Sequence, residues 1–104
     1  MEKKSKEQIR YIVKGVEEVY DASDEFERNN PLDPIEVEAA SIDDAVNIGR
    51  ERFQQKICQR RLESGHISSL QSSGGPSGMY FAHVNEVLDV SGKSVYQDFV
   101  KRTQ

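Results

Sequence analysis

The stretch from Pro34 to Asp44 constrains the fold of this chain most, because a strand pattern runs directly into a helix start. Residues 34–39 read Pro-Ile-Glu-Val-Glu-Ala, and this alternation predicts a half-buried strand whose apolar side chains face inward. Ser41 then supplies an N-cap hydroxyl, and Asp43 and Asp44 suit the positive end of a helix dipole. A strand followed at once by a helix is therefore the first element of the predicted fold.

The helix is predicted over residues 42–63. Arg60, Arg61 and Gly65 are typical of a helix C-terminus. Gly49 predicts close approach to a sheet, since glycine costs about 1 kcal/mol in a helix interior. At 100° per residue the apolar side chains fall on one stripe, which consists of Ile42, Ala45, Val46, Gly49, Phe53 and Ile57.

Three further segments are predicted to be strands. Residues 9–22 fit a helical stripe, but they are dense in β-branched residues and tyrosine, and the strand at 35–39 needs a partner. We therefore favour a strand with a bulge near Gly15 over a helix. Residues 80–90 alternate in hydropathy and predict another strand. A turn at 91–93 with Gly92 at positive φ then leads into a strand from Ser94, with a short helix as the rival.

These elements predict an α+β fold, a single domain over residues 1–104. A small antiparallel sheet of three or four strands, in the order β-β-α-β-β, packs one amphipathic helix on one face. Residues 29–34 are expected to form a loop, residues 1–7 a flexible N-terminus, and residues 64–78 a flexible loop rich in serine and glycine. The predicted core comprises Ile35, Val37, Val46, Phe53, Ile57, Tyr80, Ala82, Val84 and Leu88.

Gly92-Lys93-Ser94 matches the end of a phosphate-binding loop, but the glycine required five positions before Gly92 is Val87. Nucleotide binding is therefore not predicted. The same region carries an internal echo, since residues 18–23 match residues 86–91 at four of six positions. Two similar strand ends would account for the echo, as would chance, and it is too short to establish a repeat.

Several classes of function are disfavoured. Cys58 is the single cysteine, so no internal disulfide forms and a reducing, cytoplasmic location is expected. Cys58, His66 and His83 show no metal-ligand spacing and no nucleophile arrangement, so neither a metal, a cofactor nor an enzyme activity is predicted. The chain has no run of 18 apolar residues and no apolar leader, so no membrane association is expected.

The charge distribution suggests a partner. Residues 17–44 contain eleven acidic side chains against Arg28 alone. Such a field speeds encounter with a basic surface and orients it. The first functional hypothesis is a non-enzymatic interaction module that binds a basic host protein through Asp21, Asp24, Glu25, Glu27, Glu36 and Glu38. The alternatives are a solubilising face or, less favoured, an acid–base site among these carboxylates.

The second functional hypothesis is a small nucleic-acid-binding module. It would use Arg50, Arg52, Lys56 and Arg61 of the predicted helix, which project on both sides of the apolar stripe. A nucleic-acid interface prefers one contiguous patch with interleaved aromatic residues. We therefore favour two structural roles for these basic residues over nucleic-acid binding. They compensate the helix dipole, and they pair with the acidic strands. The oligomeric state stays open, a homodimer included.

The run from Ile35 to Val46 resembles a pattern of small phage and plasmid proteins, in which a strand leads directly into a capped helix. The DpnD/PcfM-like proteins are one example. The resemblance covers this run and a few neighbouring residues. It implies an origin in a mobile element, with a cytoplasmic location in the host, and it carries over no functional residue.

Overall fold

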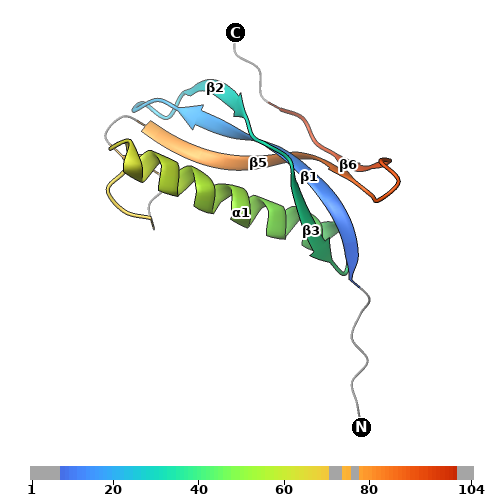
Figure 1. Cartoon of the computed structure of the whole chain (residues 1–104). Coiled ribbons are helices and arrows are strands. Elements are labelled where there is room, and N and C mark those ends of the chain that lie inside the picture. The colour runs from blue at the N-terminus through green and yellow to red at the C-terminus, as the bar shows by residue number, and fades with distance from the viewer. Residues whose placement is uncertain (1–7, 71–73, 76–77, 101–104) are drawn as a thin grey trace.

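The computed structural model describes residues 8–70, 74–75 and 78–100. In this part of the chain six strands form one antiparallel sheet, and the helix α1 (Ile42–Glu63) covers one of its faces (Figure 1). The strands are β1 (Ile9–Tyr20), β2 (Phe26–Pro31), β3 (Ile35–Ala39), β4 (Gly74–Gly75), β5 (Gly78–Leu88) and β6 (Ser94–Gln97). The predicted α+β class is confirmed.

The sheet is four strands wide, because both of its edges are divided. β1 and β5 pair in the centre. On the outer side of β1, β3 pairs with Ile9–Val13 and β2 with Val16–Tyr20. On the outer side of β5, β4 and β6 pair with opposite ends of the strand. Each edge thus consists of two short strands laid end to end.

The strand–helix unit has the predicted bounds, 35–39 and 42–63. The Ser41 hydroxyl accepts a hydrogen bond from the Asp44 N–H at 3.1 Å, which satisfies one free donor of the first turn. Gly65 follows the helix at a φ of 80°, as the C-terminal signal predicts. Local chemistry therefore suffices to start and end this helix.

Gly49 has the predicted role of close contact with the sheet. A Cβ atom built on it would lie 2.5 Å from Cγ1 of Val13 on β1, and both residues are buried. Phe53, one turn later, is 1 % exposed. The helix therefore packs tightly against β1 in a dry core at this end of the sheet.

Residues 9–20 form the favoured strand with regular alternation, and the bulge predicted within it near Gly15 lies instead on the partner strand β5, where the register shifts between Lys14 and Gly15. Val84 lies opposite Gly15 while Glu86 lies opposite Lys14, so the extra residue is Asn85 on the partner strand. The bulge inverts the alternation of β5. Val87 is consequently fully buried, and the prediction of Leu88 as a core residue is wrong.

Two strands lie where loops were predicted. β2 includes Asn29–Pro31, because β3 covers only part of the 12-residue β1 and leaves its remaining edge to be paired. Pro31 is tolerated at an edge, where no partner needs its missing N–H. β4 lies within the serine- and glycine-rich segment. The predicted flexible N-terminus and residues 71–73 and 76–77 of the predicted loop lie outside the described residues.

The outer edge of β5 between β4 and β6 is completed by a side chain of α1. Gln54 Nε2 donates to the Tyr80 carbonyl at 2.9 Å, and Gln54 Oε1 accepts from the Ala82 N–H at 2.7 Å. The amide of Gln54 thus takes the place of a neighbouring strand at these two positions. This contact ties the middle of the helix to the sheet independently of the apolar core.

The sequence echo corresponds to two matching hairpins. In the β1–β2 hairpin Tyr20 pairs with Phe26 and Val19 with Arg28. In the β5–β6 hairpin, 68 residues later, Leu88 pairs with Ser94 and Val87 with Tyr96. Both edge strands therefore bulge at the second residue after the turn. Because β1 and β5 are antiparallel, the two turns lie at opposite ends of the sheet.

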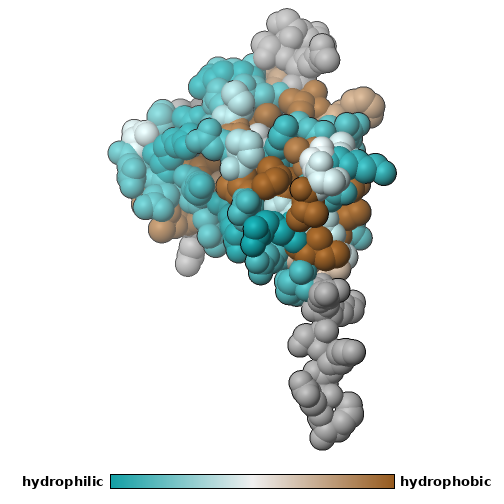
Figure 2. All heavy atoms as spheres, turned by 45° about the vertical axis from the view of Figure 1, so that its right-hand side comes forward, coloured by the Kyte–Doolittle hydropathy of each residue, from teal (hydrophilic) through white to brown (hydrophobic). Residues whose placement is uncertain are grey.

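The sheet and its one helix enclose a small core, and hydrophobic residues also reach the surface (Figure 2). Val90 in the β5–β6 turn is 76 % exposed, and Phe99 after β6 is 93 % exposed. Isolated exposed apolar residues are ordinary on a protein surface. They do not by themselves indicate a binding site.

Candidate functional site

The six acidic residues of the first hypothesis fall into two separate groups. Four lie in or just after the β1–β2 turn, and two lie on β3. Glu38 on β3 is opposite Arg10, whereas the turn begins after Tyr20. The ten residues of β1 between these positions span about 33 Å. The structure does not bring Asp21, Asp24, Glu25, Glu27, Glu36 and Glu38 together on one surface.

The β1–β2 turn is organised by Asp21. Its Oδ1 accepts hydrogen bonds from the N–H groups of Ser23 and Glu25 at 2.8 and 3.0 Å. Its backbone N–H donates to the Glu25 carbonyl at 2.9 Å, and its carbonyl accepts from the Asp24 N–H at 3.0 Å. Asp21 is therefore a structural residue of the turn, since its carboxylate replaces water on two backbone donors.

The β5–β6 turn repeats this hydrogen-bond frame with Asp89 in the place of Asp21. Asp89 Oδ1 accepts from the N–H groups of Ser91 and Lys93, and the Asp89 N–H donates to the Lys93 carbonyl. The Ser91 hydroxyl also donates to Asp89 at 2.6 Å. This hydrogen bond, assisted by the Lys93 N–H, lowers the pKa of the Asp89 carboxyl.

The two turns differ in the residues that do not build the frame. Asp24 has a φ of 66°, and its counterpart Gly92 has a φ of 87°. Glu25 corresponds to Lys93. Both acids are exposed, and neither makes an ion pair with the residues that the structure describes. The turn geometry therefore does not require the carboxylates of Asp24 and Glu25.

The remaining predicted acids lie next to cations. Glu27 contacts Arg28 at 2.9 Å, and Glu38 contacts Arg10 at 3.9 Å. Arg52 of α1 donates to the Glu36 carbonyl at 3.3 Å. A shallow hollow at this edge is lined by Gln8, Arg10, Glu36, Val37, Glu38 and Arg52, so its charges are mixed. Of the six predicted acids, Asp24 and Glu25 in the β1–β2 turn are adjacent in the chain, exposed and without an ion pair to the described residues.

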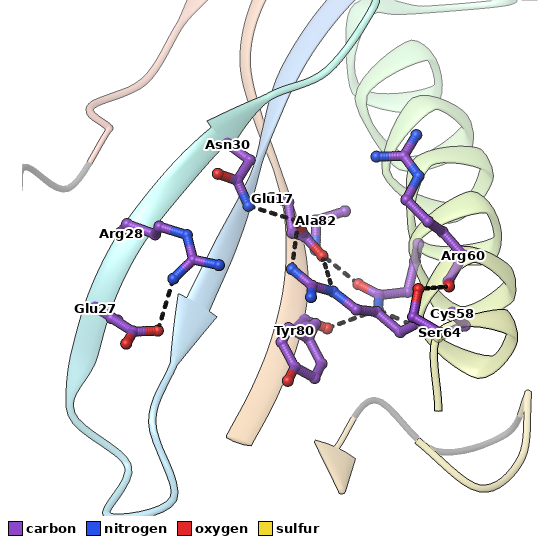
Figure 3. Close-up of polar contacts among 11 residues, drawn as sticks. Glu17, Glu27, Arg28, Asn30, Cys58, Arg60, Ser64, Tyr80 and Ala82 are labelled. Carbon is purple, nitrogen blue, oxygen red and sulfur yellow. Dashed lines mark hydrogen bonds and ion pairs between the residues drawn. The ribbon is translucent and has the colours of Figure 1, made fainter. Parts of the chain in front are cut away.

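Arg61, a residue of the nucleic-acid hypothesis, forms a buried ion pair with Glu17, and Figure 3 shows Glu17 with Asn30 and Tyr80 nearby. The Nε and Nη2 atoms of Arg61 lie 2.9 and 3.1 Å from the two carboxylate oxygens of Glu17. The side chains of Arg61 and Glu17 are only 13 % and 3 % exposed. Asn30 donates to the same carboxylate at 2.9 Å, and the Arg61 guanidinium lies 4.0 Å from the Tyr80 ring centroid. This cluster joins α1 to three strands.

The other three basic residues of that hypothesis do not form a patch with Arg61. Arg50, Arg52 and Lys56 are exposed. Arg50 contacts Asn47 at 3.4 Å, and Arg52 reaches the β3 backbone at the sheet edge. The helix therefore presents Arg52 and Lys56 one turn apart on one side of its apolar stripe and Arg50 on the other, without interleaved aromatic residues.

Glu17 was not singled out in the sequence as a structural residue. It is 2 % exposed and belongs to the helix-facing set of β1, with Val13, Gly15 and Val19 as neighbours in the alternation. Once residues 9–20 are read as a strand, period two alone places Glu17 inside. Its partner Arg61, 44 residues later in the chain, could not be identified in that way.

The described residues contain no group of three or more His, Cys, Asp and Glu side chains arranged to hold a metal ion. Cys58 is buried on α1, with Gln54 Nε2 at 3.6 Å from its sulfur. His83 lies on the sheet face opposite α1 and contacts the Phe99 carbonyl at 2.8 Å. Within the described ranges, no helix is apolar enough over a sufficient length to cross a membrane.

Comparison with known proteins yields no match to a family model, to a curated protein or to a solved structure.

Proposed function

We propose that this chain is a non-enzymatic protein-interaction module that binds a basic surface of a partner protein through its β1–β2 turn. The partner is a host protein, and the chain is an accessory protein of a phage or another mobile element in the host cytoplasm. The origin in a phage or mobile element is inferred from the resemblance of Ile35–Val46 to small phage and plasmid proteins. Asp24 and Glu25 carry the contact, and Glu27, which pairs with Arg28, lies next to them.

One observation carries the proposal. The twin turn at 89–93 has the same hydrogen-bond frame with Gly92 and Lys93 in the places of Asp24 and Glu25. Aspartate is one of the few non-glycine residues that tolerate positive φ, but glycine adopts it at lower cost, so the turn accommodates an acid at Asp24 without requiring one. An exposed carboxylate group at the end of a hairpin is well placed to attract and orient a cationic surface.

The nucleic-acid alternative is weaker because of where its residues lie. Arg61 is buried against Glu17, and the three exposed cations are divided between two sides of the helix, with Arg52 and Lys56 on one side and Arg50 on the other. Binding to a phosphate backbone depends on several cations that act together. Nuclease treatment distinguishes this alternative from binding to a protein.

The twin turn supplies a matched variant for the test. Asp24→Gly combined with Glu25→Lys copies the residues of the β5–β6 turn, so we expect the hairpin to fold while it loses its negative charge. Glu36→Gln combined with Glu38→Gln removes two acids at the distant edge. The wild type and both variants are immobilised and exposed to bacterial lysate with and without nuclease treatment, and the affinity of each retained protein is then measured against salt concentration.

The proposal expects a basic protein that is retained by the wild type and by the β3-edge variant. The turn variant should bind it about tenfold or more weakly, with a flatter salt dependence. Equal affinity of the turn variant would contradict the proposal. Retention that disappears entirely after nuclease treatment would favour the nucleic-acid alternative instead.

A further inference from the structure

The sheet face opposite α1 carries a second feature next to the acidic turn. The register places Tyr20, Phe26 and Phe81 on this face at the β1–β2 end. The ring of Tyr20 contacts the rings of Phe26 and Phe81 edge to face, with both centroid separations 5.8 Å. All three are half-buried. We call these three residues the aromatic cluster.

The twin hairpin shows that the aromatic cluster is not a requirement of the hairpin frame. Leu88 and Ser94 occupy the positions that correspond to Tyr20 and Phe26. The same hairpin geometry therefore forms with an aliphatic and a small polar side chain at these two positions, so it does not require the two aromatic rings. Aromatic side chains are enriched at binding interfaces because they bury a large area with few rotatable bonds.

The charges on this face differ between its two halves. At the β3 end the cations Lys14 and Arg10 contact Glu86 and Glu38 at 3.8 and 3.9 Å. At the aromatic cluster, Glu18 accepts a hydrogen bond from the Tyr20 hydroxyl at 2.9 Å. Its other oxygen lies 3.8 Å from His83 Nδ1. The uncompensated turn acids adjoin this half, so an occupant of the aromatic cluster meets a negative field.

We propose that the aromatic cluster is the docking site for a cationic segment of the partner that also carries an aromatic or aliphatic side chain. The apolar side chain lies on the rings, while arginine or lysine side chains reach Asp24 and Glu25 or lie over a ring face. Charge favours this occupant over a second copy, because the chain itself has a net charge of -4. This inference rests on the proposed function and specifies the chemistry of its partner.

Two synthetic peptides of equal length and charge serve as probes, one alternating arginine with phenylalanine and the other alternating arginine with serine. Their affinities for the full chain are measured by titration calorimetry. The wild type should bind the arginine–phenylalanine peptide about tenfold more tightly. Phe26→Ser, which copies Ser94 of the twin hairpin, should reduce this preference below about threefold without weakening binding of the arginine–serine peptide.

Leu88→Ala is the matched control, since it truncates the corresponding apolar residue at the other end of the same face. It should leave the preference unchanged.

A measurement on the wild type avoids any effect of substitution on folding. In NMR spectra the arginine–phenylalanine peptide should shift the ring resonances of Tyr20, Phe26 and Phe81 more than the methyl resonances of Ile12 and Leu88.

The two proposals fail in different ways. Equal binding of both peptides, weakened for both by Asp24→Gly with Glu25→Lys, would overturn the aromatic docking site and leave the acidic turn as the binding surface. Binding of both peptides that the turn variant leaves undiminished would instead contradict the proposed function. Self-association of the wild type that Phe26→Ser abolishes would assign this face to a homodimer and overturn the inference.

Discussion

The β1–β2 and β5–β6 hairpins have the same backbone and opposite surface chemistry. Each turn begins with an aspartate that accepts hydrogen bonds from N–H groups two and four residues later. Each then places one residue at positive φ, Asp24 in the first turn and Gly92 in the second. The comparison separates the residues that build a turn from the residues that the turn presents.

The interior beneath α1 differs between the same two ends of the sheet. At the β3 end Gly49 lies against Val13 in an apolar core cluster. At the β1–β2 end the helix meets β1 through the ion pair of Arg61 with Glu17, within a cluster of Val19, Ile57 and Tyr80. One helix–strand contact thus changes from apolar packing to a buried charge pair along its length.

The largest effect is expected from Glu17→Ala. The substitution leaves the Arg61 guanidinium buried without its counter-charge, and we expect a loss of about 3 kcal/mol in the free energy of unfolding. Urea denaturation measures this loss. Glu38→Ala, which breaks the exposed pair with Arg10, should cost less than about 0.5 kcal/mol. Similar losses for the two variants would show that the buried pair contributes no more than a surface pair.

A smaller effect of opposite sign is expected from Asp24→Gly. Glycine adopts positive φ without the steric cost that a Cβ atom brings, so the free energy of unfolding should rise by about 0.5 kcal/mol. Gly92→Asp in the twin turn should lower it by a similar amount. Destabilisation by Asp24→Gly would mean that this carboxylate has a structural role, which would remove the main support for the proposed function.

The smallest effect concerns pH. The pKa of Asp89 is lowered by the Ser91 hydroxyl from its usual value of 3.8, so the folded state favours the carboxylate. The resulting stabilisation is complete above that usual value and is lost as pH falls through the lower folded-state pKa. Carboxyl NMR titration should show Asp89 titrating below its usual range, and Ser91→Ala should raise its pKa. Titration at the usual value in both proteins would contradict the hydrogen-bond assignment.

The strand at 35–39 and the helix at 42–63 could be predicted to the residue, because their signals are local. Ser41 and Asp44 lie three residues apart, and the alternation in 35–39 needs no partner to be recognised. The positive φ at Gly92 was likewise predicted from the turn residues alone. Short-range steric and hydrogen-bonding preferences act within a few residues, so the sequence displays them directly.

The candidate site was only partly predictable. The sequence identified a surplus of acids, but it could not separate Asp21, which builds the turn, from Asp24 and Glu25, which the frame does not need. It also grouped Glu36 and Glu38 with acids that the structure places at the other end of β1. Acidic residues that are close in the sequence lie close in space only if the strands between them do not place them at different ends of the sheet.

By itself, then, the sequence determined the strand–helix unit, the β5–β6 turn, the α+β class and the sign of the charge. The tertiary structure decided which residues of β5 face the core, because the bulge at Asn85 depends on pairing with β1. It decided that β2 completes the edge of β1, and that Arg61 meets Glu17 across 44 residues. These features arise from contacts between distant segments, whose energies exist only once the chain has brought the segments together.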